Sequence, residues 1–169
     1  MNKKIVWGVV VLGVFLGLGY LYNQKNEEFK LITNDQELAE FMKDMEEGDV
    51  EEYLAKKDEL YAQDTYGGAT PEETLDLYIK ALKEENFELA SKYFKLEDQE
   101  NELVELQGMT KEGVVEYVSF LEIEPKNKRY DDMLNSYEID VLYDGGNVTV
   151  SKFILNQQTN KWKMENIKN

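Results

Sequence analysis

Eighteen consecutive residues without a charge, from Ile5 to Tyr22, constrain this chain more than any other feature of its sequence. A helix needs about 20 mostly apolar residues to cross the hydrocarbon core of a membrane. Lys3 and Lys4 precede the segment and Trp7 lies near its start. Flanking lysines favour a cytoplasmic N-terminus, and aromatic rings favour the membrane interfaces. The sequence therefore predicts a single-pass anchor in residues 1–25, with the bulk of the chain on the extracytoplasmic side of the cell membrane.

A cleaved signal peptide is the alternative to an anchor. Signal peptides have shorter apolar cores and typically end in an Ala-x-Ala-like site. Here the nearest small residues at that spacing, Gly17 and Gly19, still lie inside the apolar run. Gly13 and Gly17 have the GxxxG spacing that lets two membrane helices pack closely, but glycines that face lipid explain it equally well. We expect an uncleaved anchor, with self-association through it left open. Its marker residues are Ile5, Trp7, Gly13, Gly17 and Tyr22.

The part of the chain after the anchor is strongly acidic. Three of the 19 basic residues are Lys3, Lys4 and Lys25, so residues 26–169 carry 16 basic side chains against 35 acidic ones. Such a surface repels nucleic acid and anionic lipid headgroups, and it attracts cations or a basic partner. Solubility alone is the simpler explanation of the charge. We therefore expect no nucleic-acid partner.

Missing residue types exclude most catalytic chemistry. The sequence has no cysteine and no histidine, so disulfides, thiol nucleophiles and imidazole bases are absent. The run "YGGAT" lacks the Gly-Lys-Ser/Thr ending of a phosphate loop. The acidic run "DDMLNSYEID" lacks the glycine and the terminal glutamate of a calcium loop. We therefore expect no catalytic residue, no metal and no cofactor.

Residues 26–66 are predicted to form an acidic helical hairpin or stalk. Thr33 and Gln36 match a capping box before apolar residues at helical spacing. Gly48 is predicted to break this helix, and Asp49 to cap a second one. The stretch "QDTYGGAT" then marks a linker.

The clearest helix signals begin at Thr70. Thr70 is predicted to be the N-cap, with Pro71 at the first helical position and Glu73 completing a capping box. The buried face of this helix is predicted to be Leu75, Tyr78, Ile79 and Leu82. A second helix is predicted over residues 86–94, with Phe87, Ala90, Tyr93 and Phe94 on one side. This hairpin resembles residues 33–51 at an offset of 37. The resemblance indicates either a duplication or the general likeness of capped amphipathic hairpins.

The remaining residues predict one more helix and a sheet. The pattern weakens after Phe94. Thr110 is then predicted to cap a helix that Pro125 and a basic cluster close. Alternation over 137–143, the turn "DGGN", alternation over 148–155 and the segment "KWKMENI" predict a meander of three antiparallel strands. The helix face is Val114, Tyr117, Val118 and Leu121, and the basic cluster is Lys126, Lys128 and Arg129.

This order of elements resembles the nuclear-transport-factor-2-like, cystatin-type α+β cone, in the form found in bacterial lipoproteins and envelope proteins. The resemblance covers residues 70–168, and "EEN" departs from the usual Gly-Asp turn. It implies helices packed on the concave side of a curved sheet, with a pocket often open between them. The matching residues are Thr70, Pro71, Glu72, Glu73, Tyr78, Ala81, Leu82, Phe87, Glu88, Ala90, Tyr93, Lys161, Trp162, Lys163 and Ile167.

The sequence thus predicts an α+β chain: a transmembrane helix, a helical hairpin, and a cone over residues 70–169 in which Leu82 and Trp162 are both buried. We expect a non-enzymatic, membrane-anchored extracytoplasmic domain that binds a protein or peptide partner in the cell envelope. The alternative is a small-molecule pocket with isomerase-like acid–base chemistry, in which a carboxyl such as Asp140 or Glu138 lies beside a tyrosine. The candidate pocket residues, which a packed core explains equally well, are Tyr78, Tyr93, Tyr117, Tyr137, Tyr143 and Trp162.

Overall fold

The structure is a computed structural model that describes residues 29, 31–32, 36, 39–40, 43, 47–124, 126–131 and 136–166. The chain divides into two compact units, Met1–Lys30 and Leu31–Asn169, and the second unit holds the fold described below. The predicted anchor over residues 5–22 and most of the predicted helix after Thr33 lie outside the described residues. The duplication at an offset of 37 therefore stays a prediction.

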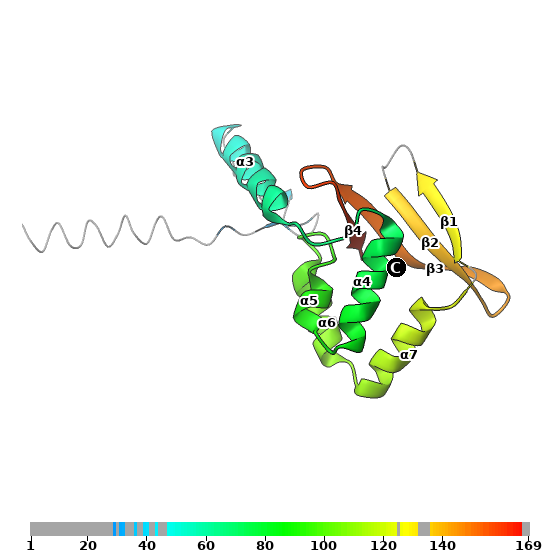
Figure 1. Cartoon of the computed structure of the whole chain (residues 1–169). Helices are drawn as coiled ribbons and strands as arrows, with labels where there is room; N and C mark the ends of the chain where they lie inside the picture. The colour runs from blue at the N-terminus through cyan, green and yellow to red at the C-terminus, as the bar shows by residue number, and fades with distance from the viewer. Residues whose placement is uncertain are drawn as a thin grey trace, which may run out of the picture. The chain divides into compact units, whose positions relative to one another are not determined.

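The described part of the second unit is α+β, with five helices followed by a four-stranded antiparallel sheet of order β1-β2-β3-β4 (Figure 1). The helices are α3 (Glu47–Gln63), α4 (Pro71–Lys83), α5 (Phe87–Ser91), α6 (Gln99–Gly108) and α7 (Lys111–Leu121). The strands are β1 (Lys126–Asp131), β2 (Ser136–Tyr143), β3 (Gly146–Asn156) and β4 (Lys161–Glu165).

Helix α3 corrects two predictions. It includes both Gly48 and Asp49, so Gly48 does not break the helix and Asp49 is not its N-cap. A single exposed glycine costs a helix only about 1 kcal/mol, and the glutamate, leucine, alanine and lysine residues that follow are good helix formers. The helix ends at Gln63, and the predicted linker follows over residues 64–70.

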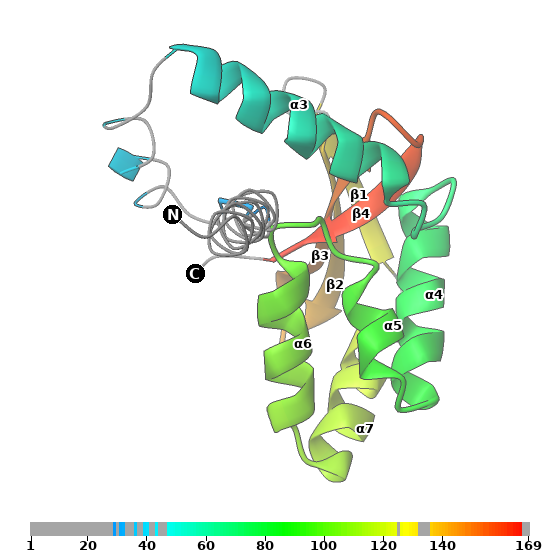
Figure 2. The same cartoon turned by 90° about the vertical axis from the view of Figure 1, so that its left-hand side faces the viewer.

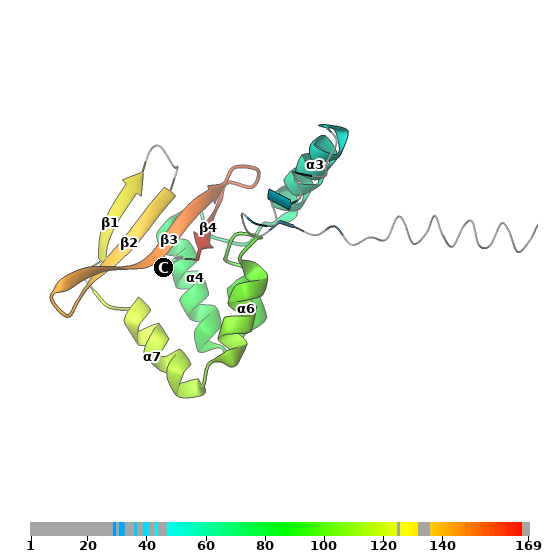
Figure 3. The same cartoon turned by 180° about the vertical axis from the view of Figure 1, so that it is seen from behind.

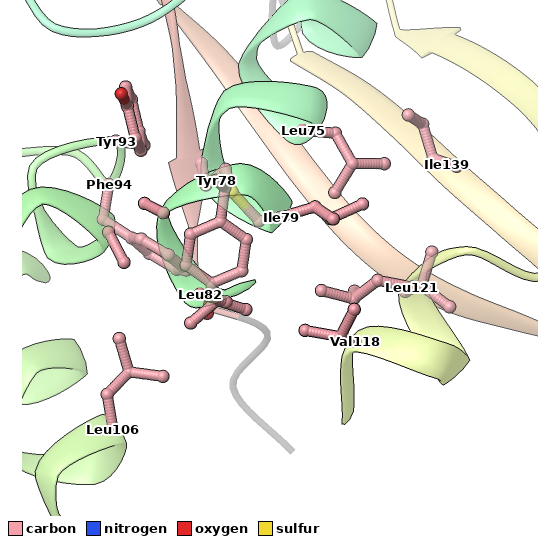
Figure 4. Close-up of a cluster of buried hydrophobic side chains, with 14 of the residues drawn as sticks. Leu75, Tyr78, Ile79, Leu82, Tyr93, Phe94, Leu106, Val118, Leu121 and Ile139 are labelled. Atoms are coloured by element: carbon pink, nitrogen blue, oxygen red, sulfur yellow. The ribbon is translucent and has the colours of Figure 1, made fainter. Parts of the chain in front are cut away.

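Helix α4 begins as predicted. The Thr70 hydroxyl accepts the Glu73 backbone N–H at 3.1 Å, and Pro71 occupies the first helical position. The Glu73 carboxylate differs from a standard capping box, because it accepts the Ala69 N–H at 2.6 Å. All four predicted core residues of this helix are buried. Figure 4 shows them converging with Leu106 of α6, Val118 and Leu121 of α7, and Ile139 of β2.

Helix α5 is shorter than predicted. It ends at Ser91 because the next backbone segment pairs with β4. Phe94 forms a parallel bridge with Met164. The Met164 N–H donates to the Tyr93 carbonyl at 2.8 Å, and the Lys95 N–H donates to the Met164 carbonyl at 2.9 Å. The chain after α5 thus extends the sheet beyond β4.

Helix α6 and strand β1 are absent from the sequence-based predictions. The buried face of α6 is Gln99, Glu102 and Leu106, so the apolar spacing that signals a helix is missing. Strand β1 is the sequence KNKRYD, which has no apolar alternation. A polar, lysine-bearing strand is typical of a sheet edge, where charge discourages pairing with other chains. The basic residues therefore form an edge strand and do not simply close α7.

The sheet has one apolar face and one charged face. Tyr130, Tyr137, Phe153 and Met164 are cross-strand neighbours in one row. The adjacent row is Arg129, Glu138, Lys152 and Glu165, which alternates in charge. Figure 1 shows α4, α5, α6 and α7 on one side of the sheet, Figure 3 shows the same arrangement from behind, and Figure 2 shows it turned by 90°. Since Phe153 and Met164 are buried, the apolar row faces the helices.

A bulge changes the predicted strand pattern. The register shifts between Ile139 and Asp140, and both residues are buried together with Val141. The extra residue is Val150 of β3, between the paired residues Thr149 and Ser151, so the bulge interrupts the predicted alternation of β3. Tyr143, at the end of β2, is exposed. The "DGGN" turn is confirmed: Asp144 and Gly145 have φ of 48° and 79°, and Tyr143 pairs with Gly146.

The core confirms one burial prediction and corrects another. Leu82 is buried, but Trp162 is only half-buried. Trp162 packs edge-on against Tyr130 and Tyr137, with ring centroids 6.5 and 6.2 Å away. Tyr130 is itself exposed, so this end of the apolar face is not fully covered by the helices.

Candidate functional site

An apolar hollow of about 640 Å³ lies between the end of α4, the start of α5 and the length of α7. Leu82, Val114 and Val118 are buried residues at its floor, and Phe87 is half-buried beside them. Ligand sites are usually concave, mostly apolar and several hundred Å³ in volume. The hollow therefore meets the basic requirements of a binding groove, and we call it the α4–α7 groove.

The lip of the α4–α7 groove carries exposed apolar side chains. Val115 is 67% exposed and Met109 is 37% exposed. Val115 directly follows the buried Val114, so α7 is apolar on its packed side and again on the side facing outward over the groove. A valine on α6, Val104, is exposed to nearly the same extent at 65% but is not among the groove residues.

Two exposed ion pairs connect the elements on either side of the groove. Lys83 Nζ lies 2.6 Å from Glu122 Oε1, joining the end of α4 to the residue after α7. Lys111 Nζ lies 3.0 Å from Glu85 Oε1, joining the start of α7 to the α4–α5 turn. Exposed pairs of this kind contribute little to stability, since water screens them. Each of these four side chains can therefore leave its present partner and form an ion pair with a charged group of a bound protein.

A second, charged hollow of about 490 Å³ meets the first at the Lys83–Glu122 pair. Both hollows are lined by these two residues. The second hollow is also lined by Asp76, Ile79, Lys80, Glu124 and Lys126. Together the two hollows form a continuous surface with an apolar part, a charged part and one ion pair where they meet.

A different polar cluster is buried between α4, α6 and α7. The Tyr78 hydroxyl donates to Glu102 Oε1 at 2.6 Å. The ring of Tyr117 lies 6.4 Å from that of Tyr78, at 77° to it. Burial raises the pKa of Glu102 to about 7, although the hydrogen bond from Tyr78 opposes the shift. Burial also raises the pKa of Tyr117 to about 12 and raises that of Tyr78. The pKa of Glu102 therefore lies near neutral pH.

The predicted pocket residues do not gather in one place. Tyr78 and Tyr117 belong to the Glu102 cluster, and Tyr93 is buried after α5. Tyr137 and Trp162 contact each other on the sheet face. Tyr143 is exposed and packs on Phe120, with centroids 5.5 Å apart. None of the predicted residues lines the α4–α7 groove.

The two carboxyl groups expected beside a tyrosine have other partners. Glu138 Oε2 lies 2.6 Å from Arg129, and Asp140 Oδ2 lies 3.0 Å from the same guanidinium. Asp140 also accepts the Thr149 hydroxyl at 2.7 Å. Arg129 of β1 thus holds both carboxyls and Thr149 of β3 also holds Asp140, whereas Glu102 is a buried carboxyl that contacts a tyrosine.

Glu72 is the carboxyl beside Tyr137. The Tyr137 hydroxyl donates to Glu72 Oε1 at 2.9 Å, and Lys128 Nζ lies 2.6 Å from the same oxygen. Partial burial opposes ionisation, but hydrogen bonds from Lys128, the Glu72 backbone and Tyr137 outweigh it and lower the pKa of Glu72 to about 2. Glu72 is therefore a fixed negative charge that ties α4 to β1 and β2.

A buried ion pair joins the linker to β4. Lys163, only 1% exposed, places Nζ 2.9 and 2.8 Å from the two oxygens of Asp64. It also donates to the carbonyls of Tyr66 at 3.2 Å and Lys92 at 2.5 Å. Burial lowers the pKa of Lys163, while Asp64 opposes the shift. Every donor of the ammonium is used inside the protein, so this pair is structural.

Sequence reasoning missed the groove residues Met109 and Val115 and the buried Glu102. One signal was present for Val115. In "GVVEYV" the second valine is an extra apolar residue beside the predicted helix face, which is how an apolar residue on an exposed lip looks in a sequence. No sequence signal marked Glu102, because glutamate at helical spacing is normally exposed.

Comparisons with protein-family models, with curated proteins and with solved structures gave no match. Within the residues that the structure describes, no helix combines the length and the apolar character needed to cross a membrane. The same residues contain no group of three acidic side chains placed to hold a metal ion.

Proposed function

We propose that this chain is a membrane-anchored, extracytoplasmic protein of non-enzymatic type, and that its α+β domain binds a protein or peptide partner in the cell envelope through the α4–α7 groove. The observation that carries the proposal is the combination of a roomy apolar groove with Val115 at its lip, 67% exposed. Exposed apolar surface next to a concave, charge-rimmed groove is typical of protein interaction sites.

The location and the family are part of the same proposal. The uncharged run over residues 5–22, preceded by two lysines, supports a single-pass anchor with a cytoplasmic N-terminus. Helices packed on the apolar face of an antiparallel sheet support a nuclear-transport-factor-2-like cone over residues 70–169. Such folds carry many functions, so the groove and not the fold is the basis of the functional proposal.

Site-specific photo-crosslinking in native membranes tests the groove. A photo-reactive amino acid replaces Val115 in the full chain, and the matched control carries it at Val104, whose exposure is nearly equal. We expect a discrete adduct only from position 115, with its attached peptide identified by mass spectrometry. The Met109→Ser change should weaken that adduct, because it removes apolar surface from the lip. Adducts of equal yield from both positions, or none at position 115, would contradict the proposal.

Protease accessibility tests the location. Protease added to intact spheroplasts should digest residues 30–169, because the proposed topology places them outside the cytoplasmic membrane. Immunodetection of a C-terminal tag follows the digestion, with a cytoplasmic protein as the protection control. Full protection of the tag in intact spheroplasts, and digestion after lysis, would contradict the topology.

The Glu102 cluster favours a second candidate function, a small-molecule site with isomerase-like acid–base chemistry. A carboxyl with a pKa of about 7 beside a tyrosine hydroxyl has the proton affinity that such chemistry needs at neutral pH. Neither hollow described above is lined by Tyr78 or Glu102, so the binding function has the stronger support. Titration of Glu102 by NMR with and without a panel of small cyclic ketones tests this candidate, since a bound ketone must change the pKa of Glu102.

A further inference from the structure

We infer that the partner segment of the α4–α7 groove is an apolar peptide carrying lysine or arginine at one end, and that this cation takes the place of Lys83 on Glu122. The inference rests on the proposed binding function of the groove. It adds the charge of the partner and names the residue of this chain that recognises it.

The position of the Lys83–Glu122 pair is the first observation. It lies where the apolar groove ends and the charged hollow begins, since both residues line both hollows. A peptide whose apolar side chains fill the groove and whose chain continues into the charged hollow presents its next residue at this pair. A cationic peptide residue there is attracted by Glu122 and repelled by Lys83, and an anionic residue experiences the reverse. The pair therefore takes part in selecting the sign of the peptide's charge.

The weakness of the pair is the second observation. The Lys83 and Glu122 side chains are 52% and 47% exposed, although Nζ and Oε1 are only 2.6 Å apart. An exposed pair between flexible side chains is easily exchanged, because water compensates the group that leaves. Lys83 can therefore move into solvent when a partner's cation takes its place beside Glu122.

The charge of the surroundings decides which sign is favoured. The elements around the groove carry more exposed carboxylates than lysines, and the chain as a whole has a net charge of −16. This field draws a cationic segment toward the groove and repels an anionic one. Over residues 71–91 and 111–122 the exposed carboxylates are those of Glu73, Asp76, Glu84, Glu85, Glu88, Glu112, Glu116 and Glu122, and the exposed lysines are Lys80, Lys83 and Lys111.

An acidic partner would require the opposite exchange. Its carboxylate would have to displace Glu122 from Lys83 while entering a region rich in carboxylates. The two alternatives predict opposite effects for the same pair of substitutions. Lys83→Ala frees Glu122 for a cationic peptide, whereas Glu122→Gln removes its binding group. Both side chains are about half exposed, so neither change disturbs the core.

The test uses the full chain in nanodiscs of zwitterionic lipid and three fluorescein-labelled 12-residue peptides. All three have the same leucine- and valine-rich core, and they end in two arginines, two glutamates or two glutamines. Fluorescence anisotropy measures the affinity of each peptide for the unmodified chain, Lys83→Ala, Glu122→Gln and Val115→Asp. Empty nanodiscs correct for binding to lipid, and circular dichroism confirms that each variant is folded.

We expect the arginine peptide to bind most tightly, with an affinity that falls as salt is added. Lys83→Ala should strengthen its binding several-fold, Glu122→Gln should weaken it several-fold, and Val115→Asp should weaken the binding of all three peptides. Tightest binding of the glutamate peptide, or equal affinities that still depend on Val115, would overturn the inference and leave the groove proposal standing. If no peptide binds the unmodified chain, both the inference and the groove proposal are contradicted.

Discussion

Two carboxyl groups are buried to almost the same extent in this domain, in two regions that treat them differently. Asp64, between α3 and α4, is 7% exposed, and Glu102 of α6 is 5% exposed. Asp64 receives the ammonium of Lys163 at 2.8 Å. Glu102 receives the Tyr78 hydroxyl at 2.6 Å, and burial raises its pKa to about 7. The first region pairs its carboxyl with a buried cation, whereas the second holds a carboxyl without a cation, and burial moves its pKa to about 7.

The comparison shows how strongly a neighbouring cation affects proton binding by a carboxyl group when the extent of burial is nearly equal. Burying an unpaired carboxylate is costly, so such a group binds a proton more readily than it does in water. A cation in contact removes that cost, but it must itself be buried and satisfied. The contribution of the Asp64 region to the unfolding free energy therefore depends on one residue, Lys163. The contribution of the Glu102 region depends on pH.

Removing the cation should have the largest effect. Lys163→Met leaves Asp64 buried without its partner, and breaking a buried pair in this way costs about 3–5 kcal/mol of unfolding free energy. The double variant with Asp64→Asn should recover part of that loss, because the uncompensated charge is gone. Urea denaturation measures both. Lys152→Met, in a more exposed pair with Glu165, is the control and should cost less than about 1 kcal/mol.

Removing the titrating carboxyl should change the pH dependence of stability. The pKa of Glu102 is raised in the folded state to about 7 from its ordinary value of 4.5, so the folded state holds this proton more tightly than the unfolded state. The stability from this group is therefore complete below pH 4.5 and is lost as pH rises to about 7. Between pH 4 and pH 8 the unmodified chain should lose on the order of 3 kcal/mol more than Glu102→Gln does.

Denaturation over that pH range measures the effect. Glu100→Gln, at an exposed position of the same helix that does not contribute to the pKa shift of Glu102, is the matched control and should keep the original pH profile. A Glu102→Gln variant with an unchanged profile would show that burial alone does not control the Glu102 proton, and the contrast with Asp64 would fail.

Removing the phenol should have a smaller effect in the same region. Tyr78→Phe deletes the donor to Glu102 and should cost about 1–2 kcal/mol near neutral pH, as expected for a buried hydrogen bond to a group that carries charge. The pKa of Glu102 should rise further, because the hydrogen bond from Tyr78 lowers it. NMR titration measures the shift. Tyr143→Phe, at an exposed ring, should leave both quantities unchanged.

Breaking a rim pair should have the smallest effect. Lys83→Ala removes the exposed pair with Glu122 and should change the unfolding free energy by less than about 1 kcal/mol, with the difference disappearing in high salt. Thermal denaturation at low and high salt measures it. A loss as large as that of Lys163→Met would mean that the pair supports the fold. Replacing Lys83 by a partner's cation would then cost a large part of the unfolding free energy.

The sequence predicted the elements whose local chemistry agrees with their place in the fold. Thr70 and Thr110 both accept the backbone N–H three residues later, as their position before apolar helices indicated. The turn at Asp144 and Gly145 followed from residues that tolerate positive φ. The missed elements, α6 and β1, have neither signal, because one buries polar side chains and the other is a polar edge strand.

The buried polar pairs and the α4–α7 groove were harder to predict because they depend on contacts between residues that are distant in the sequence. Asp64 and Lys163 are 99 residues apart in the sequence, and Tyr78 and Glu102 are 24 apart. Nothing local distinguishes Glu102 from the many exposed glutamates of the chain. The groove depends on how α7 lies beside α4, which residue spacing within either helix does not fix. The sequence shows which residues can form ion pairs and hydrogen bonds, but it does not show which residues they contact.

The linker over residues 64–70 has a mechanical consequence. The Trp162 N–H donates to the Gly68 carbonyl at 3.0 Å, and Asn156 donates to the Tyr61 carbonyl at 2.9 Å. Gly67 has a φ of 115°, and a side chain there would lie 2.3 Å from the Trp162 carbonyl oxygen. These contacts fix the linker rigidly against the sheet, so it does not act as a flexible hinge between α3 and α4. Tension applied along α3 passes through this linker into β4 and, by its ladder with β3, into the sheet, so the load reaches the fold before it reaches α4.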